Sequence, residues 1–192
     1  MQLQDYYSAL SIYIPTLPTL PTASVYDAIN RARRDLAAMS DITMTVTSLS
    51  LLANTASYAY PTVNGCDIIS IYKYGVWGYN GNLRYAINRR DAAEYPLANF
   101  NGLPSRYWLK NRTITFWPTP AIAMQSDLKV KLRPVTLANP TDTDNQITEE
   151  YQDALTFLAG SYVAMADRNQ NLAEYLKEQF KEQMSRLPRD NM

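Results

Sequence analysis

The spacing of hydrophobic residues divides this chain into three stretches. Up to residue 41, and again after residue 146, hydrophobic residues recur every three or four positions, which is typical of helices with one buried face. Between these stretches they alternate with polar residues in short runs separated by turn residues, which is typical of strands. The pattern predicts an α+β fold. A discontinuous helical domain, residues 1–41 and 146–192, packs as a bundle, and residues 42–138 form an inserted, mainly antiparallel β-sheet or sandwich domain, followed by a linker, residues 139–145.

The N-terminal stretch predicts two helices joined by a proline-rich segment. Residues 3–10 have helical spacing, and a capping box with Ser24 as N-cap and Asp27 as its partner predicts the start of the second helix. Between them, a proline at every third position (Pro15, Pro18 and Pro21) predicts an extended polyproline II segment. Such a segment is either a ligand for a proline-binding groove or a strap on its own domain. The leucines between the prolines repeat in the same phase, which favours the strap.

The second helix has an apolar stripe and a charged side. The stripe consists of Val25, Ile29, Ala32, Leu36 and Met39. On the polar side, where we also place Asn30 and Asp35, three arginines form a small basic cluster: Arg31, Arg33 and Arg34. Because Asp27 and Asp35 are close by, we interpret the cluster as a solvated or intersubunit ion-pair face rather than as a phosphate site.

The middle stretch predicts six strands. Residues 44–51 alternate, but the phase changes at Ser48, which predicts a β-bulge. Further strands are expected at residues 68–74, 83–87, 107–109, 113–117 and 127–133. The glycine-rich residues 75–82 are expected to form a turn.

Two C-terminal helices follow the linker. Thr148 is the expected N-cap, and Glu149 and Glu150 lie in the first turn, where the helix dipole favours carboxylates. Two apolar stripes, separated by the polar residues 167–171, predict a break between helices. The stripes are Ile147, Tyr151, Leu155, Leu158, Tyr162 and Met165, then Leu172, Leu176, Phe180 and Met184. Nearby carboxylates (Asp142, Asp144 and Asp153) could hold a hard cation, but we interpret the first two as part of a solvated turn.

Composition excludes several chemistries. The 192 residues include no His and one Cys, Cys66, so a Ser-His-Asp triad, a histidine metal site and an intrachain disulfide are excluded. The adjacent Glu149 and Glu150 do not match a glycosidase pair, which requires carboxylates on separate elements. We therefore expect no enzyme activity, no metal and no cofactor. The 18 Lys and Arg balance the 18 Asp and Glu, which argues against electrostatic binding to nucleic acid, and prolines and polar residues interrupt the uncharged runs, which argues against a membrane span.

Tyrosine makes up 15 of the 22 aromatic residues. Tyr has a large apolar ring and a hydroxyl that needs a hydrogen-bond partner, so it suits contact surfaces that remain partly solvated. The bias therefore favours a chain that packs against other subunits. The alternative is a carbohydrate-binding β module that stacks sugars on surface rings. The candidate rings are Trp77, Tyr79, Tyr107, Trp108 and Trp117.

Three segments resemble the head-to-tail connector, or adaptor, proteins of tailed bacteriophages, including the tail tubular protein A group. They are residues 25–36 with the preceding helix and proline link, residues 104–120 with their aromatic strand and Pro-Thr-Pro ending, and residues 132–180. The resemblance implies a structural virion protein made in the host cytoplasm and located in the neck. Twelve copies would form a ring beneath the portal protein and extend the DNA exit channel toward tail or nozzle proteins, with double-stranded DNA passing through without specific binding.

Two sets of contact residues are expected for this role. The subunit-interface set is Arg31, Arg34, Asp35, Tyr107, Trp108 and Trp117. The portal-contact set is Phe180, Met184, Arg186, Leu187 and Arg189, where apolar residues beside arginines resemble an anchor. The alternative for this second stretch is a frayed, solvated terminus.

Overall fold

The computed structural model describes residues 1–91 and 100–187, and it divides the chain into two compact units. The helical unit comprises Met1–Thr43 and Pro134–Met192, and the β unit comprises Met44–Arg133. Four α-helices and mainly antiparallel sheets are present in the described residues, so the fold class is α+β.

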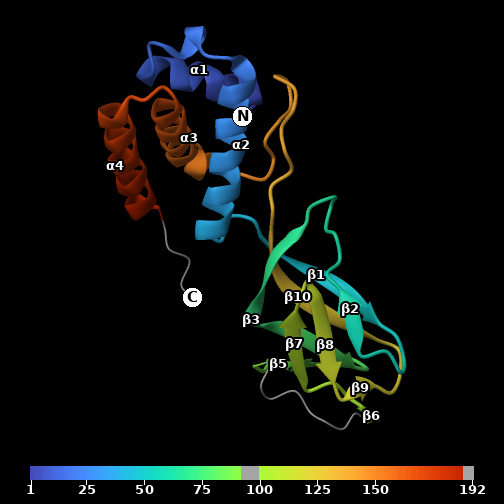
Figure 1. The fold of residues 1–192 in the computed structure, drawn as a ribbon. Helices are drawn as coiled ribbons and strands as arrows, with labels where there is room; N and C mark the ends of the chain where they lie inside the picture. The colour runs from blue at the N-terminus through green and yellow to red at the C-terminus, as the bar shows by residue number, and fades with distance from the viewer. Residues whose placement is uncertain (92–99, 188–192) are drawn as a thin grey trace. The chain divides into compact units, whose positions relative to one another are not determined.

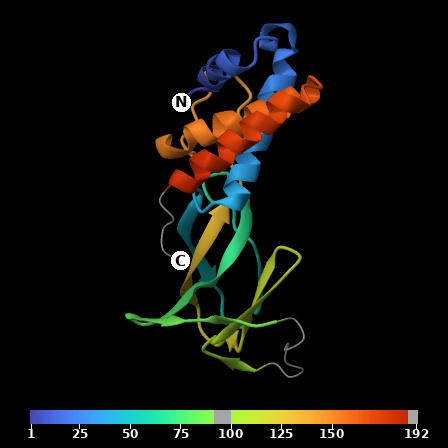
Figure 2. The ribbon, with the colours of Figure 1, turned by 90° about the vertical axis from the view of Figure 1, so that its left-hand side faces the viewer.

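The helical unit contains α1 (Leu3–Tyr13), η1 (Leu17–Thr19), α2 (Thr22–Met39), η3 (Glu149–Tyr151), α3 (Gln152–Ala166) and α4 (Gln170–Arg186). Within this unit α3 lies between α2 and α4, and α1 lies across one end of them (Figure 1). Figure 2 shows α3 and α4 running side by side. A shared core includes Leu10, Ile29, Leu36, Leu155 and Leu158.

The proline segment is not extended. Thr16 has helical backbone angles, and the Leu20 N–H donates to the Leu17 carbonyl, so residues 17–19 form a 3-10 turn. Proline fits the first turn of a helix because it has no N–H to leave unpaired. Leu17 is fully buried, so the predicted packing of this segment on its own domain is confirmed although the polyproline II conformation is wrong.

The predicted capping box is also wrong. Helix α2 begins at Thr22, two residues earlier than expected, with Pro21 as N-cap, and no side chain caps it. Four of the five stripe residues are buried, but Met39, at the end of the helix, is 58% exposed. Asn30, which was placed on the polar side, is buried.

The predicted break between the C-terminal helices is confirmed. Helix α3 ends at Ala166, Arg168 has a positive φ of 59°, and the Asn169 side chain caps α4 by accepting the Leu172 N–H. At the start of this region, Thr148 precedes the 3-10 turn η3 but makes no side-chain cap. Met165, assigned to the apolar stripe, is 45% exposed.

The β unit contains two four-stranded sheets that share one core. The first has the order β1 (Met44–Leu51), β10 (Met124–Leu132), β3 (Ile68–Asn80) and β4 (Leu83–Ala86). The second has the order β2 (Ser57–Ala59), β8 (Thr113–Trp117), β7 (Arg106–Lys110) and β5 (Asn88–Arg89), and a two-stranded sheet pairs β6 (Asn101–Gly102) with β9 (Thr119–Pro120). Val76 and Leu128 of the first sheet and Phe116 of the second lie in this common core.

Two predicted irregularities in the first sheet are in the wrong place. Strand β1 pairs with β10 in unbroken register from Met44 to Leu51, so Ser48 marks no bulge; the register shifts lie between β10 and β3. The predicted turn is confirmed only at residues 81–82, between β3 and β4, because β3 continues through Gly75 and Gly78. A Cβ atom at Gly75 would lie 2.6 Å from the Lys129 Cβ, and one at Gly78 would lie 2.6 Å from the Tyr85 ring. These glycines therefore allow close packing in a strand rather than a turn.

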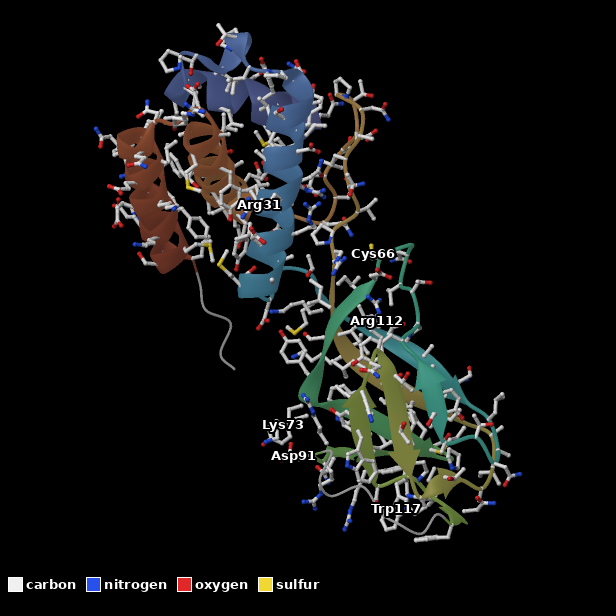
Figure 3. All side chains as sticks on the ribbon, in the orientation of Figure 1. Arg31, Cys66, Lys73, Asp91, Arg112 and Trp117 are labelled. Atoms are coloured by element: carbon white, nitrogen blue, oxygen red, sulfur yellow. The ribbon has the colours of Figure 1, made fainter. Side chains whose placement is uncertain are left out.

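The hairpin β7–β8 is confirmed. Its two turn residues, Asn111 and Arg112, both have positive φ, 48° and 58°, which is the geometry of the type I′ turn that joins twisted strands. Figure 3 shows Arg112 and Trp117 at opposite ends of β8.

Candidate interaction surfaces

A buried ion pair fixes the segment that returns from the β unit to the helical unit. Arg33 of α2 donates from Nε to Asp144 Oδ2 and from Nη2 to Asp144 Oδ1, each at 2.8 Å. The two side chains are 1% and 0% exposed. This segment, residues 134–148, runs beside α2 (Figure 1). The guanidinium and carboxylate planes match in this bidentate arrangement, which is the strongest form of the pair.

Further hydrogen bonds satisfy the remaining polar atoms of this network. Arg33 also donates to the Val135 carbonyl and to Asn30, whose amide exchanges hydrogen bonds with the backbone of Leu137. Tyr6 donates to Asp144 at 3.2 Å, and burial together with the Asp144 charge raises the pKa of Tyr6. Because each buried polar atom has a partner, the network holds the return segment in one conformation.

This network corrects two predictions. Arg33 does not belong to a solvated basic cluster, and Asp144 does not belong to a solvated turn.

The boundary between the units also differs from the expected one. Residues 134–138 were expected in the β domain but lie in the helical unit, where Leu137 is buried in the core. The expected linker, residues 139–145, packs against α1, because the Leu3 N–H donates to the Asp142 carbonyl. Asp142 accepts N–H bonds from Asn139 and Ala138, which lower its pKa.

Three predicted interface residues lie on α2. Arg31 (labelled in Figure 3) extends from α2 toward α3. Its Cζ atom lies 4.6 Å from the centre of the Tyr162 ring, and its Nε atom lies 3.8 Å from Asp35 Oδ2. The Tyr162 hydroxyl donates to Asp35 at 2.7 Å, and burial, then this hydrogen bond, raises the pKa of Tyr162 to about 12. Arg31 and Asp35 therefore join α2 to α3 while remaining partly exposed, and Arg34 is exposed.

The predicted portal-contact residues lie at the end of α4. Phe180 and Met184 are partly buried against the helical core, so they are less exposed than an unattached anchor would be. Arg186 is exposed and pairs with Glu182, and Leu187 is half-buried. Arg189 lies outside the described residues. A contact with a portal protein remains a prediction for these residues.

Two predicted interface rings of the β unit lie inside it. Tyr107 is 0% exposed and donates to the Tyr72 and Lys73 carbonyls, and burial raises its pKa to about 12. Trp108 is 4% exposed and donates to the Asp91 carbonyl. Because their faces are buried, these rings support the fold and cannot stack on a sugar or another subunit.

The other candidate rings are half-exposed and contact nearby side chains. Arg84 lies 4.1 Å from the centre of Trp77, and Arg106 lies 5.1 Å from the centre of Trp117. Phe100 packs edge-on against Trp117. Because arginines lie over these rings, the rings offer less free surface for stacking on a sugar. The combination of arginine and aromatic side chains is instead typical of protein–protein interfaces.

The outer face of the first sheet combines cations with aromatic rings. The register of β10, β3 and β4 places Trp77, Tyr79, Arg84, Asp127 and Lys131 on this face, away from the core residues Leu128 and Val76. Tyr72 and Lys129 lie at the register shift between β3 and β10, and their Cβ atoms meet over Gly75 on the same face. The Lys129 ammonium is 5.3 Å from the centre of Tyr72, and Asp127 accepts from Tyr79 and lies 4.0 Å from Arg84. We call these residues the basic–aromatic face.

Comparison with known proteins assigns the family. A search of curated proteins found no significant match. A family model described as SU10 adaptor protein matches residues 1–192, the whole chain. The chain belongs to the SU10 adaptor protein family. It is therefore a structural adaptor of bacteriophages, as the resemblance indicated at this coarser level.

No helix in the described part of the adaptor is both long and apolar enough to span a membrane. Among residues 1–91 and 100–187, the structure contains no cluster of Cys, Asp and Glu side chains with the geometry of a metal site.

Sequence reasoning missed how charge is distributed in this adaptor. The β unit contains ten Lys and Arg but only four Asp and Glu, so its net charge is +6. The helical unit contains eight Lys and Arg but 14 Asp and Glu, so its net charge is −6. The neutral total conceals this asymmetry, and counting charge for each expected domain would have found it. The neutral total therefore does not exclude electrostatic attraction between nucleic acid and the positively charged β unit.

Proposed function

We propose that this adaptor is a head-to-tail adaptor of the virion neck. Copies made in the host cytoplasm assemble into a ring of twelve beneath the portal protein, and the ring extends the DNA exit channel toward tail or nozzle proteins. The match of an adaptor family model to all 192 residues carries the proposal. Likeness to the tail tubular protein A group remains part of the proposal.

The exposed side chains of α2 and of the β unit support contacts between two different surfaces of neighbouring copies. A ring requires each copy to present two different, complementary surfaces, because the contact is heterologous. Arg31, Arg34 and Asp35 offer such a surface on α2, and Trp117 offers one on the β unit. These four residues keep their place in the proposed subunit interface, and the buried Tyr107 and Trp108 leave it.

The end of α4 is the proposed portal contact. Arg186 is exposed, Leu187 is half-buried, and both follow the partly buried Phe180 and Met184, so a polar and an apolar group lie together at one helix end. Interfaces gain most of their binding free energy from such mixed aromatic, apolar and arginine contacts.

Double-stranded DNA passes through the proposed ring without sequence-specific binding. A net charge of zero for the whole chain gives a ring little overall attraction for the duplex. The positive charge lies in the β unit, so how strongly the channel wall holds DNA depends on which surfaces the neighbouring copies cover.

Electron microscopy of the adaptor mixed with its portal protein tests the proposal. We expect extra density in the form of a ring on one end of the portal. Arg186→Glu should weaken this attachment, whereas Lys181→Glu, which alters a similarly exposed, ion-paired cation of the same helix, should not. Portals that stay bare with the unaltered adaptor would contradict the proposed function.

A further inference from the structure

The opposite charges of the two units make one copy of this chain complementary to another. The β unit has a net charge of +6 and the helical unit −6. A surface that serves a heterologous contact must match a different surface of the same chain, and opposite net charge provides such a match.

The positive partner surface is best defined on the basic–aromatic face. Arg84, Lys129 and Lys131 lie on it with a single carboxylate, Asp127, and the side chain of Arg84 is 48% exposed. Arg, Tyr and Trp are the residues that interfaces favour and that carry most of their binding free energy. Two of these cations lie over rings, Trp77 and Tyr72, and are thereby held at the surface.

The helical unit carries negative charge that its own cations do not neutralise. Arg33 is used by the buried Asp144, and Lys181 and Arg186 pair with Glu178 and Glu182. Glu149, Glu150 and Asp153 are exposed, and none of them has an ion pair with another residue in the described ranges. The surplus negative charge of this unit is therefore available to a basic partner.

We infer that the basic–aromatic face of one copy binds the acidic helical unit of a second copy. The inference rests on the proposed ring and adds a second pair of contact surfaces to the one that includes Arg31, Arg34, Asp35 and Trp117. A protein occupant fits better than duplex DNA, because stacked bases offer no free ring face to Trp77 and Tyr72, whereas a protein surface covers rings and cations together.

Two charge variants test this contact. Arg84→Glu with Lys129→Glu and Lys131→Glu brings the β unit from +6 to 0, and Glu149→Lys with Glu150→Lys and Asp153→Lys brings the helical unit from −6 to 0. The control, Arg89→Glu with Lys110→Glu and Arg112→Glu, makes the same change in net charge with exposed cations associated with the second sheet. If the face reversal does not fold, the milder variant Arg84→Gln with Lys129→Gln and Lys131→Gln removes the positive charges of the face without reversing them, and self-association is measured on it instead.

Sedimentation velocity at low salt measures association of the full chains. Each reversal should weaken self-association by about tenfold or more, as expected when like charges replace opposite ones, and the control should change it much less. The two reversal variants mixed together should associate again, because the unaltered helical unit of the first matches the unaltered face of the second and the two reversed surfaces also carry opposite charges. High salt should weaken association of the unaltered chain.

The outcomes separate this inference from the proposed function. Association equal to that of the unaltered chain in both reversals, or equal loss in the control, would overturn the inference while rings on portals still supported the function. Binding of a short DNA duplex by the unaltered chain that the face reversal abolishes, with self-association unchanged, would assign the face to nucleic acid and also overturn it. An unaltered chain that stays monomeric in solution at low salt would overturn the inference, and one that also leaves portals bare would overturn the proposed function as well.

Discussion

Arg33 and Asp144 lie 111 positions apart in the chain and form an ion pair that is almost completely buried. Residue patterns along α2 could not identify this pair, because Arg33 has the same charge and the same neighbours as the exposed Arg31 and Arg34. Its role depends on a loop that tertiary packing brings beside the helix. The apolar residues of the same helix could be predicted, since Val25, Ile29 and Leu36 follow helical spacing.

Arg33→Met should destabilise the adaptor by about 3 to 5 kcal/mol, because it leaves the Asp144 carboxylate buried without its partner. Arg34→Met, an exposed neighbour on the same helix, should change stability by less than about 0.5 kcal/mol. Urea unfolding followed by circular dichroism measures both. Similar midpoints for the two variants would show that the pair contributes no more than a surface charge.

The buried Tyr107 should make the adaptor less stable at high pH. Burial raises its pKa to about 12, whereas in the unfolded chain it ionises near the ordinary tyrosine value of 10.0. Above the unfolded value the unfolded chain releases a proton that the native state still holds, so stability falls as the pH rises toward 12.

Tyr107→Phe removes this titration and leaves other alkaline effects in place. The stability advantage of the unaltered chain over this variant should shrink by about 2 to 3 kcal/mol between neutral pH and about pH 12. Urea unfolding at several pH values measures it. A difference that is constant with pH would mean that Tyr107 ionises equally easily in both states.

At the scale of elements, the sequence patterns predicted whether a segment is a helix or a strand better than they predicted where it begins and ends. The break between α3 and α4 was found because five polar residues interrupt two apolar stripes, and the β7–β8 hairpin because Asn111 and Arg112 separate two aromatic strands. The proline segment and the glycines of β3 were misassigned, since their conformations depend on packing: Leu17 is drawn into the core, and Gly78 lies against Tyr85.

The cap of α4 gives a test at this scale. Asn169→Ala should cost about 1 kcal/mol, because the Leu172 N–H loses its acceptor. Asn171→Ala, an exposed position in the first turn of the same helix, should cost little or slightly stabilise it. Thermal unfolding of both variants provides the comparison, and equal melting temperatures would contradict the assigned cap.

At the scale of the whole molecule, the chain is two units with separate cores and opposite charge. The sequence predicted an inserted β region, but its net charge was hidden by the neutral total. The candidate contact residues were predicted less well, because an aromatic residue in a strand gives no sign of which sheet face it occupies: Tyr107 and Trp108 are buried, and Trp117 is half-exposed.

Residues 44–133 expressed alone should fold. Their ends are adjacent, since Met44 pairs with Lys131 across β1 and β10, and their core draws on both sheets. The fragment should show the circular dichroism of β structure, unfold cooperatively and bind a cation exchanger at neutral pH, where the whole chain does not. A fragment without ordered structure would contradict the independence of the β unit.

Native mass spectrometry of the purified portal–adaptor assembly tests the central claim most directly, because it counts the copies of this chain on each portal ring. The proposed role predicts twelve copies on every ring and no smaller number of attached chains at saturation. Portal rings that carry no copies, with the chain recovered as a free monomer, would contradict it.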